Sequence, residues 1–307
     1  MIKWVVLYCI LLFNILHATI EDYFKKISDK SASHQIRNID FIYMINLDER
    51  PEKYQISLEQ LAPYEIFPYR FSAVNGWGLS LAAINAIGLR YESWMQQGIW
   101  GTFYPMQHSG SHFHEIMTAR NKNYFCHRMS KGAIGIALSH LSILQDAYDS
   151  GYETVWIMED DIEVIRNPLV LSDLINELDA LVGKNNWDIL FTDQDTKGQD
   201  GRYVPCFSYA QRPNFFPLDP EKFSKRYNVS PNLRYVGARY GAYSMIVRRS
   251  GMRKILNFIK SYCLFLPFDM EYTQPDQIRL FTVIDDVVST LPAALSDNSA
   301  PYYLQKK

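Results

Sequence analysis

Residues 154–161 read TVWIMEDD, and this stretch decides the fold because it joins a buried strand directly to three acids. The apolar and β-branched residues of 154–158 predict a compact buried strand. Glu159, Asp160 and Asp161 follow at once, where desolvation and like-charge repulsion penalise each carboxylate. A divalent cation removes that difficulty, and oxygen ligands suit Mg²⁺ or Mn²⁺, which can also bind a diphosphate. The alternative is a solvated loop with ordinary acids.

Helices and a second strand of the same kind flank this stretch. The spacing of apolar residues predicts one helix over 132–148 and another over 169–182. Residues 187–192 (WDILFT) predict a strand, which runs into Asp193 and Asp195. This second acidic cluster also follows an apolar strand, so spacing alone does not separate the two candidate cation sites.

The outer parts of the chain continue the alternation of strands and helices. We expect strands at 41–45, 66–71 and 243–247, helices from Pro51 and over 250–259 with Ser250 as its N-cap, and a long polar loop over 196–234. The alternation predicts an α/β sheet with ligands at strand ends.

Residues 77–131 stand apart as an aromatic-rich insertion that also holds His112 and His114. A His-x-His pair could bind a metal if it lay on a strand, but the neighbouring spacing matches no standard site. We expect the aromatic side chains mainly to pack. A surface that helps to hold a sugar is the alternative.

The composition of the chain indicates which classes of protein it can belong to. The chain has 307 residues, and 48% of them are hydrophobic, which is the balance of a folded globular protein. The formal net charge is −2 and no long run of Lys or Arg occurs, so no nucleic-acid-binding surface is expected. Cys126, Cys206 and Cys263 have no paired spacing, and buried free thiols are expected.

The N-terminus differs from the rest of the chain. Residues 1–18 place Lys3 before an apolar run, as in a secretory signal peptide or a short membrane anchor. The run is shorter than the roughly 20 residues that span a bilayer comfortably. We expect 19–38 to be a linker or surface helix and 39–307 to form a single domain. The location would then be the secretory pathway or a membrane, which in a bacterium means the cytoplasmic face of the inner membrane.

Several short segments follow one another in a specific order over roughly residues 40–270. They are 45–50 (INLDER), 71–76 (FSAVNG), 132–140 (GAIGIALSH), 159–161 (EDD), 241–243 (GAY), 249–251 (RSG) and 267–269 (PFD). In order and rough spacing they resemble glycosyltransferase family 25, which includes bacterial lipopolysaccharide galactosyltransferases and collagen galactosyltransferases. Glu49 departs from the family, many members of which carry Arg there, and the segment after 270 matches poorly.

The resemblance implies a fold and an activity. The fold is GT-A, a Rossmann-like nucleotide-sugar-binding half and an acceptor half around one mixed central sheet with flanking helices. The activity is inverting, metal-dependent transfer of a hexose, often galactose, from a UDP-sugar to a glycan, lipopolysaccharide or protein acceptor.

The resemblance also implies roles for particular residues. It implies a nucleotide-sugar site of Asn46, Leu47, Arg50, Ser139, His140, Glu159 and Asp160, with Asp161 as the ligand of Mn²⁺ or Mg²⁺. The cation stabilises the charge of the leaving UDP as a Lewis acid. Inversion needs a carboxylate that takes the proton from the attacking hydroxyl, and Asp269 is the candidate for this general base. Its alternative role is that of a helix cap or loop acid.

Two other functions remain open. The first is a catalytically silent family member that acts in binding or adhesion, which the intact acidic triplet and Asp269 disfavour. The second is a metal-dependent phosphohydrolase that uses the acidic strand ends without a sugar acceptor.

Overall fold

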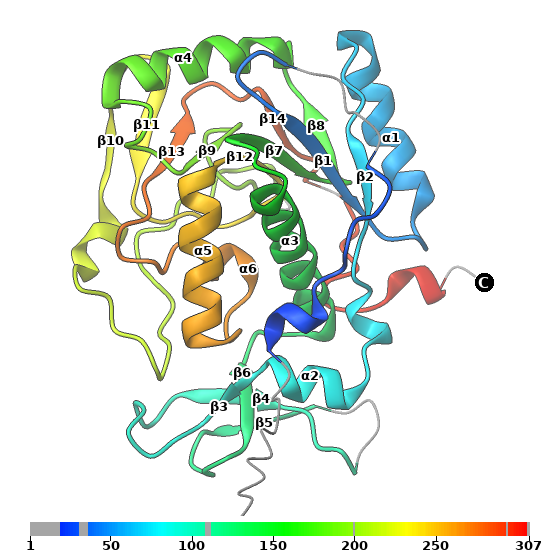
Figure 1. Cartoon of the computed structure of the whole chain (residues 1–307), viewed down its shortest axis with the longest axis vertical. Helices are drawn as coiled ribbons and strands as arrows, with labels where there is room; N and C mark the ends of the chain where they lie inside the picture. The colour runs from blue at the N-terminus through cyan, green and yellow to red at the C-terminus, as the bar shows by residue number, and fades with distance from the viewer. Residues whose placement is uncertain (1–18, 31–35, 108–111, 199, 293, 306–307) are drawn as a thin grey trace, which may run out of the picture.

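The fold is a mixed α/β arrangement in which helices cover a large central sheet (Figure 1). The computed structural model describes residues 19–30, 36–107, 112–198, 200–292 and 294–305, so the expected signal peptide or anchor at 1–18 lies outside the described residues. Within these ranges, no helix is both long and apolar enough to cross a membrane. The expectation of a large mixed sheet with flanking helices is confirmed.

The central sheet has eight strands in the order β10–β11–β13–β9–β12–β7–β1–β2. Strand β7 pairs in parallel with β1 and in antiparallel orientation with β12, which makes the sheet mixed. The strands are β1 (Phe41–Asn46), β2 (Tyr69–Ser72), β7 (Thr154–Glu159), β9 (Ile189–Phe191), β10 (Arg226–Asn228), β11 (Leu233–Val236), β12 (Ser244–Arg248) and β13 (Leu280–Val283).

The two faces of the sheet carry two separate hydrophobic clusters, because side chains alternate along each strand. On β7, Val155 and Ile157 belong to one cluster, and Trp156 and Met158 belong to the other. The first cluster includes residues of helices α3 (Lys131–Asp149) and α5 (Arg249–Tyr262), which lie side by side in Figure 1. The second includes residues of α1 (Pro51–Leu61) and α4 (Leu171–Val182). Burial on both faces explains why β1 is apolar over 41–45 and β7 over 155–158.

The register of the central strands brings polar residues to one edge of the sheet. β1 and β7 are parallel, with Ile45 opposite Glu159, and β2 ends beside them with Ser72 opposite Asn46. The antiparallel β12 begins at this edge, where Ser244 faces Met158. The INLDER, EDD and GAY segments therefore meet at the same edge although they are far apart in the sequence.

The insertion at 77–131 forms a small layer of its own. It contains helix α2 (Leu81–Ile87) and a four-stranded sheet in the order β3–β6–β4–β5, with strands β3 (Leu89–Arg90), β4 (Trp100–Phe103), β5 (Phe113–Ile116) and β6 (Asn123–Cys126). Tyr104, Tyr124 and Phe125 are buried in the same cluster as α3, so many of its aromatic side chains do pack. Trp94 and Trp100 are more than half exposed.

Three local expectations are wrong. Helix α5 begins at Arg249 with Arg248 as its N-cap, and Ser250 instead donates a hydrogen bond to Asp188 Oδ1 (2.6 Å). The expected loop at 196–234 contains β10 and the start of β11, which form the far edge of the sheet. Residues 66–68 precede β2, which starts at Tyr69. The described cysteines Cys126, Cys206 and Cys263 are free, as expected.

The remaining elements lie around the polar edge or at the periphery. They are η1 (Ile20–Tyr23), η2 (Ala62–Tyr64), η3 (Gly76–Gly78), β8 (Ile162–Val164), η4 (Pro168–Val170), η5 (Pro220–Ser224), α6 (Phe268–Glu271), β14 (Val288–Thr290) and η6 (Tyr302–Gln305). The linker expected at 19–38 thus includes one short helical turn, η1.

Candidate active site

The acidic triplet lies where β7 ends and the chain turns into β8. Glu159 is the last residue of β7, and Asp160 and Asp161 form the turn. A distant segment of the chain holds this turn in place, because the backbone N–H of Leu291 donates a hydrogen bond to the carbonyl of Asp161 (2.9 Å). The side chains of all three acids therefore line one pocket at the polar edge of the sheet.

Asp161 is the least satisfied of the three acids. Its Oδ1 is inaccessible to solvent and has no hydrogen-bond partner among the residues that the structure describes. Burial, followed by the charge of Glu159, raises the pKa of Asp161 to about 7. An unpaired buried carboxylate is costly unless a cation or donor comes to it.

Asp160 has partial compensation. Its Oδ2 accepts a hydrogen bond from Asn46 Nδ2 (2.6 Å), and its Oδ1 lies 3.9 Å from Lys53 Nζ. Burial nevertheless raises the pKa of Asp160 to about 6, with Lys53 acting in the opposite direction. Two neighbouring carboxyl groups are thus held in an environment that disfavours their charged forms.

Glu159 faces helix α3, where His140 holds it. His140 is fully buried, and its Nε2 lies 3.0 Å from Glu159 Oε1. The other ring nitrogen, Nδ1, has no partner in the described part of the chain, so we place the proton on Nε2, where Glu159 accepts it. The imidazole also stacks on Phe268, with 4.3 Å between ring centroids and 9° between planes.

The end of β1 supplies the next wall of the pocket. Besides holding Asp160, Asn46 donates to the carbonyl of Arg50 (2.8 Å) and accepts from Arg70 Nε (2.7 Å). Leu47 lines the pocket directly. Asn46 is itself 1% exposed and lies outside the pocket lining, so the structure places it behind the acids, as a residue that positions Asp160.

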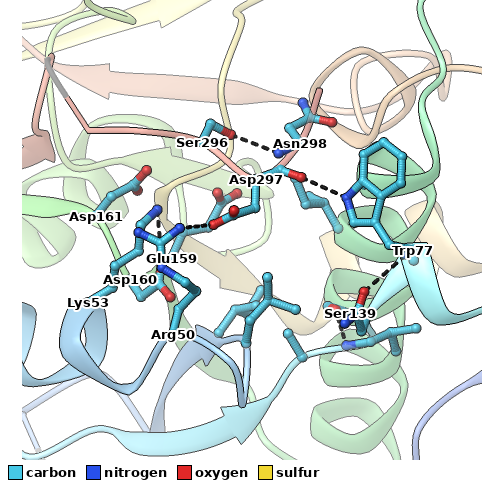
Figure 2. A pocket seen from close by; sticks show the side chains of 18 residues that line it. Arg50, Lys53, Trp77, Ser139, Glu159, Asp160, Asp161, Ser296, Asp297 and Asn298 are labelled. Carbon is cyan, nitrogen blue, oxygen red and sulfur yellow. Dashed lines mark hydrogen bonds and ion pairs between the residues drawn. The ribbon is translucent and has the colours of Figure 1, made fainter. Parts of the chain in front are cut away.

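Arg50 points its guanidinium into the pocket, but acids already occupy it. Its Nε donates to Glu52 Oε1 (2.7 Å), and its Nη1 donates to Asp297 Oδ2. Figure 2 shows Asp297 between Arg50 and Trp77. The arginine expected at the nucleotide therefore pairs with two acids of the same chain.

Ser139 lines the pocket but uses its hydroxyl to hold the fold together. It accepts from the backbone N–H of Val74 (2.8 Å) and donates to the carbonyl of Gly135 (2.8 Å). The turn that it holds lies very close to α3, because a Cβ on Gly76 would come within 1.8 Å of the Lys131 carbonyl oxygen. Ser139 thus helps to place the neighbouring Trp77 at the rim.

The pocket as a whole has a volume of about 80 Å³. Its lining combines the acids with residues of β1, η3, α3 and the C-terminal segment: Ile45, Leu47, Arg50, Lys53, Ala73, Val74, Asn75, Gly76, Trp77, Gly132, Ile136, Ser139, Glu159, Asp160, Asp161, Ser296, Asp297 and Asn298 (Figure 2). Lys53, Trp77 and residues 296–298 were not expected from the sequence. No motif marks them, because their place depends on packing between distant segments.

Asp269 lies in a second cavity, of about 170 Å³, that adjoins the first. Glu159, Ser296 and Asn298 line both cavities, and Asp269 lines the second. Asp269 Oδ2 accepts a hydrogen bond from the backbone N–H of Gly241 (3.1 Å). Burial is the main cause that raises the pKa of Asp269, and the charge of Glu159 contributes in the same direction. Glu159 thus lines both the pocket that holds Asp160 and Asp161 and the cavity that holds Asp269.

The second acidic cluster, after β9, differs from the first because arginines occupy it. Asp193 is paired with Arg239 and also accepts from Tyr243 (2.5 Å). Asp195 is paired with Arg226. Both carboxylates therefore hold cationic side chains of the same chain, although Asp195 Oδ1 has no hydrogen-bond partner within the ranges that the structure describes. Of these two clusters, and among the described residues, the triplet after β7 is the one that keeps an acid without a cationic partner at hydrogen-bond distance.

The triplet fits a cation that is shared with a substrate. In the described ranges, no three His, Cys, Asp or Glu side chains already converge on one point, and this includes the His112 and His114 pair. Mg²⁺ is usually held by only one or two carboxylates, with waters and substrate phosphates as the other ligands. The free Oδ1 of Asp161, with Asp160 beside it, meets that smaller requirement.

Comparison with known proteins agrees with the motifs. Residues 39–272 match the model of a family described as glycosyltransferase family 25 (LPS biosynthesis protein). A human protein named "Inactive glycosyltransferase 25 family member 3" is 24% identical over 217 residues, which are 71% of this chain and 28% of the relative. The mouse protein of the same name is 24% identical over 152 residues, 50% of this chain and 21% of the relative. The chain spans about a quarter of the length of these curated relatives.

Proposed function

The chain belongs to glycosyltransferase family 25, and from this we propose that it transfers a hexose, with galactose as the first candidate, from a UDP-sugar to a glycan, lipopolysaccharide or protein acceptor. We also propose that its sheet is a GT-A fold, that Mn²⁺ or Mg²⁺ is required, and that the anomeric carbon is inverted. If residues 1–18 act as a signal or anchor, transfer takes place in the secretory pathway or at a membrane surface.

The observation that carries the proposal is the unpartnered carboxylate of Asp161 beside Asp160 in a pocket that also holds a cationic side chain. Buried acids and an arginine in the same pocket suit a ligand that combines a divalent cation with phosphates. Bound there, a divalent cation would supply Lewis-acid stabilisation of the diphosphate as the glycosidic bond breaks. Asp161 and Asp160 would hold it.

The other residues of the pocket can bind and orient a nucleotide. Arg50 and Lys53 offer positive charge for phosphate groups, and a guanidinium can pair with phosphate in a bidentate manner. Trp77 offers an aromatic face at the rim, where a uracil ring could stack. Asn46 would act indirectly by fixing Asp160.

Asp269 is suited to take the proton from the acceptor hydroxyl. A general base works best when its pKa approaches the working pH, and burial moves the pKa of Asp269 upward from that of a free carboxyl. Its cavity adjoins the donor pocket through Glu159. The sugar would thus lie near Glu159, with the acceptor entering from the side of Asp269.

A catalytically silent binding protein is the second candidate, and the names of the two curated relatives favour it. Such a protein could keep the fold and the nucleotide pocket without turnover. This chain covers only about a quarter of those relatives, so their printed inactivity concerns much longer proteins.

One experiment separates the two candidates. The purified chain is incubated with a panel of UDP-sugars, Mn²⁺ and a mixture of acceptor glycans, and UDP release is measured. A metal-dependent transferase releases UDP with one donor preferred, EDTA stops the release, and Asp161→Asn removes most of it. Asp219→Asn serves as the control, because Asp219 pairs with Lys225 in an exposed ion pair. Tight binding of UDP without any turnover would establish the silent alternative instead.

A further inference from the structure

Residues 296–298, which we call the C-terminal strap, cross the mouth of the candidate donor pocket. The carboxylate of Asp297 accepts from Arg50 Nη1, and its backbone carbonyl accepts from Trp77 Nε1 (2.9 Å). The carbonyl of Asn298 accepts from Ser130 Oγ (2.6 Å). Figure 2 shows the strap reaching from Arg50 to Trp77. Three separate parts of the domain therefore hold this short segment.

The central contact of the strap is buried. The side chains of Arg50 and Asp297 are 6% and 5% exposed. A second contact fixes the same carboxylate, because Asp297 Oδ1 accepts from the backbone N–H of Tyr303 (3.1 Å). A desolvated ion pair with additional hydrogen bonds is costly to break by removing one partner. The pair can separate without leaving Arg50 unpaired when another anion replaces Asp297 beside the guanidinium.

The strap lies where the two cavities meet. Ser296 and Asn298 line both the donor pocket and the cavity of Asp269, whose volumes are about 80 and 170 Å³. Pockets for small-molecule ligands usually measure roughly 300–1,000 Å³. Each cavity alone is well below this range, and displacement of the strap would open the two to each other.

We propose that the Asp297 carboxylate stands in for the donor's diphosphate on Arg50, and that a diphosphate ligand displaces the strap and joins the two cavities. This inference rests on the proposed function, because it names where the diphosphate of the donor binds. Carboxylate and phosphate are the two anions that a guanidinium pairs with in the same bidentate way. Only molecules with an open strap then bind the donor, so the apparent affinity is the intrinsic affinity multiplied by the fraction of open molecules.

The backbone of the strap offers an independent way to test the idea. It lies so close to α3 that a Cβ on Gly132 would come within 2.3 Å of the Asn298 carbonyl oxygen and 2.7 Å of its Cα. Gly132→Ala should therefore push the strap away without touching Arg50 or Asp297, and alanine is favourable inside a helix. Asp297→Asn removes the charge of the strap and leaves its shape. Two variants with different physical causes should act in the same direction.

The experiment is a calorimetric titration of the full chain with UDP in the presence of Mn²⁺. Asp297→Asn and Gly132→Ala should each bind UDP more tightly than the wild type, on the order of tenfold. Asp219→Asn, on the exposed Asp219–Lys225 pair, should bind like the wild type. Uridine, which has no phosphate to pair with Arg50, should show no gain in Asp297→Asn. Circular dichroism confirms that each variant is folded.

Hydrogen exchange gives the second measurement. UDP should speed exchange of the backbone amides in 294–304 of the wild type, because the ligand releases the strap. Protection of those amides by UDP, or equal or weaker UDP binding in both variants, would overturn the inference and leave the proposed function standing. No UDP binding by the wild type or by either variant would overturn the inference and the proposed donor together.

Discussion

Asp161→Asn should make the cation-free protein more stable at pH 8 while it abolishes transfer. The structure gives the magnitude. The pKa of Asp161 rises from 3.8 to about 7, a shift of about three units, and each unit corresponds to about 1.36 kcal/mol. The upper bound is thus about 4 kcal/mol. Because only Oδ1 is fully inaccessible and the residue as a whole is partly buried, we expect a gain of about 1–3 kcal/mol.

The stability gain of Asp161→Asn over the wild type should increase as the pH rises. A carboxyl whose pKa is raised by folding binds more protons in the native state, so the stability of the wild type falls as pH rises from about 4 to about 7. The penalty is absent below this window and complete above it. The difference between Asp161→Asn and the wild type should therefore be large at pH 8 and smaller at pH 5.

Urea unfolding in EDTA at both pH values measures this difference, and repeating it with Mn²⁺ tests the site. Mn²⁺ should stabilise the wild type, by about 2.7 kcal/mol at a hundredfold excess over its Kd, and leave the variant unchanged. Asp48→Asn is the control with the opposite sign, because hydrogen bonds from Ser72 and Arg70 hold the pKa of Asp48 below its usual value, so this variant should be less stable than the wild type at pH 8. If Asp161→Asn is less stable than the wild type at pH 8, or if the difference between them is the same at both pH values, Asp161 does not carry an unpaired buried charge.

Three further predictions concern turnover. Asp195→Asn should reduce UDP release much less per folded molecule than Asp161→Asn, and the opposite ranking would move the cation to the second strand end. Asp269→Asn should lower the transfer rate by roughly 10²–10⁴-fold with UDP-sugar affinity nearly unchanged, as a titration alongside the rate assay would show; normal transfer would exclude it as the base. His140→Phe, which removes the N–H that Glu159 accepts, should lower kcat roughly 10-fold or more and shift its pH profile. His140→Gln should restore part of both, and equal loss in the two variants would mean a purely structural role.

The main elements of the fold could be predicted because the central strands are short and apolar and end in polar residues. Residues 154–158 are correctly predicted as a strand, and the strand predicted at 187–192 is present but shorter (Ile189–Phe191), since burial on both sheet faces leaves a nearly continuous apolar run. The edge strand β10 and its neighbour β11 were missed, because an edge strand is half exposed and polar, and the sequence of Arg226–Asn228 is typical of a loop. The N-cap of α5 was misplaced because Ser250 has a tertiary partner in Asp188.

The two acidic clusters show where local sequence stops being informative. Glu159–Asp161 and Asp193–Asp195 both follow apolar strands, and nothing in their spacing separates them. What differs is the partner: Arg226 and Arg239 reach the second cluster from segments more than 30 residues later. Charge compensation in a folded protein is decided by the sheet order and not by the sequence neighbourhood. The family resemblance chose the first cluster, and the geometry of the ion pairs favours the same one independently.

The strap explains why the segment after 270 matters although its sequence carries no motif. A polar segment such as 296–298 is equally compatible with a free tail and with a closed pocket, because its contacts are mostly through backbone carbonyls. The one side chain that gives it a function, Asp297, is significant only through its buried pairing with Arg50. Arg50, expected from the sequence to contact the nucleotide, pairs with this carboxylate in the structure. A basic residue expected at a phosphate, found paired with a carboxylate of the same chain, indicates a site that its ligand must open.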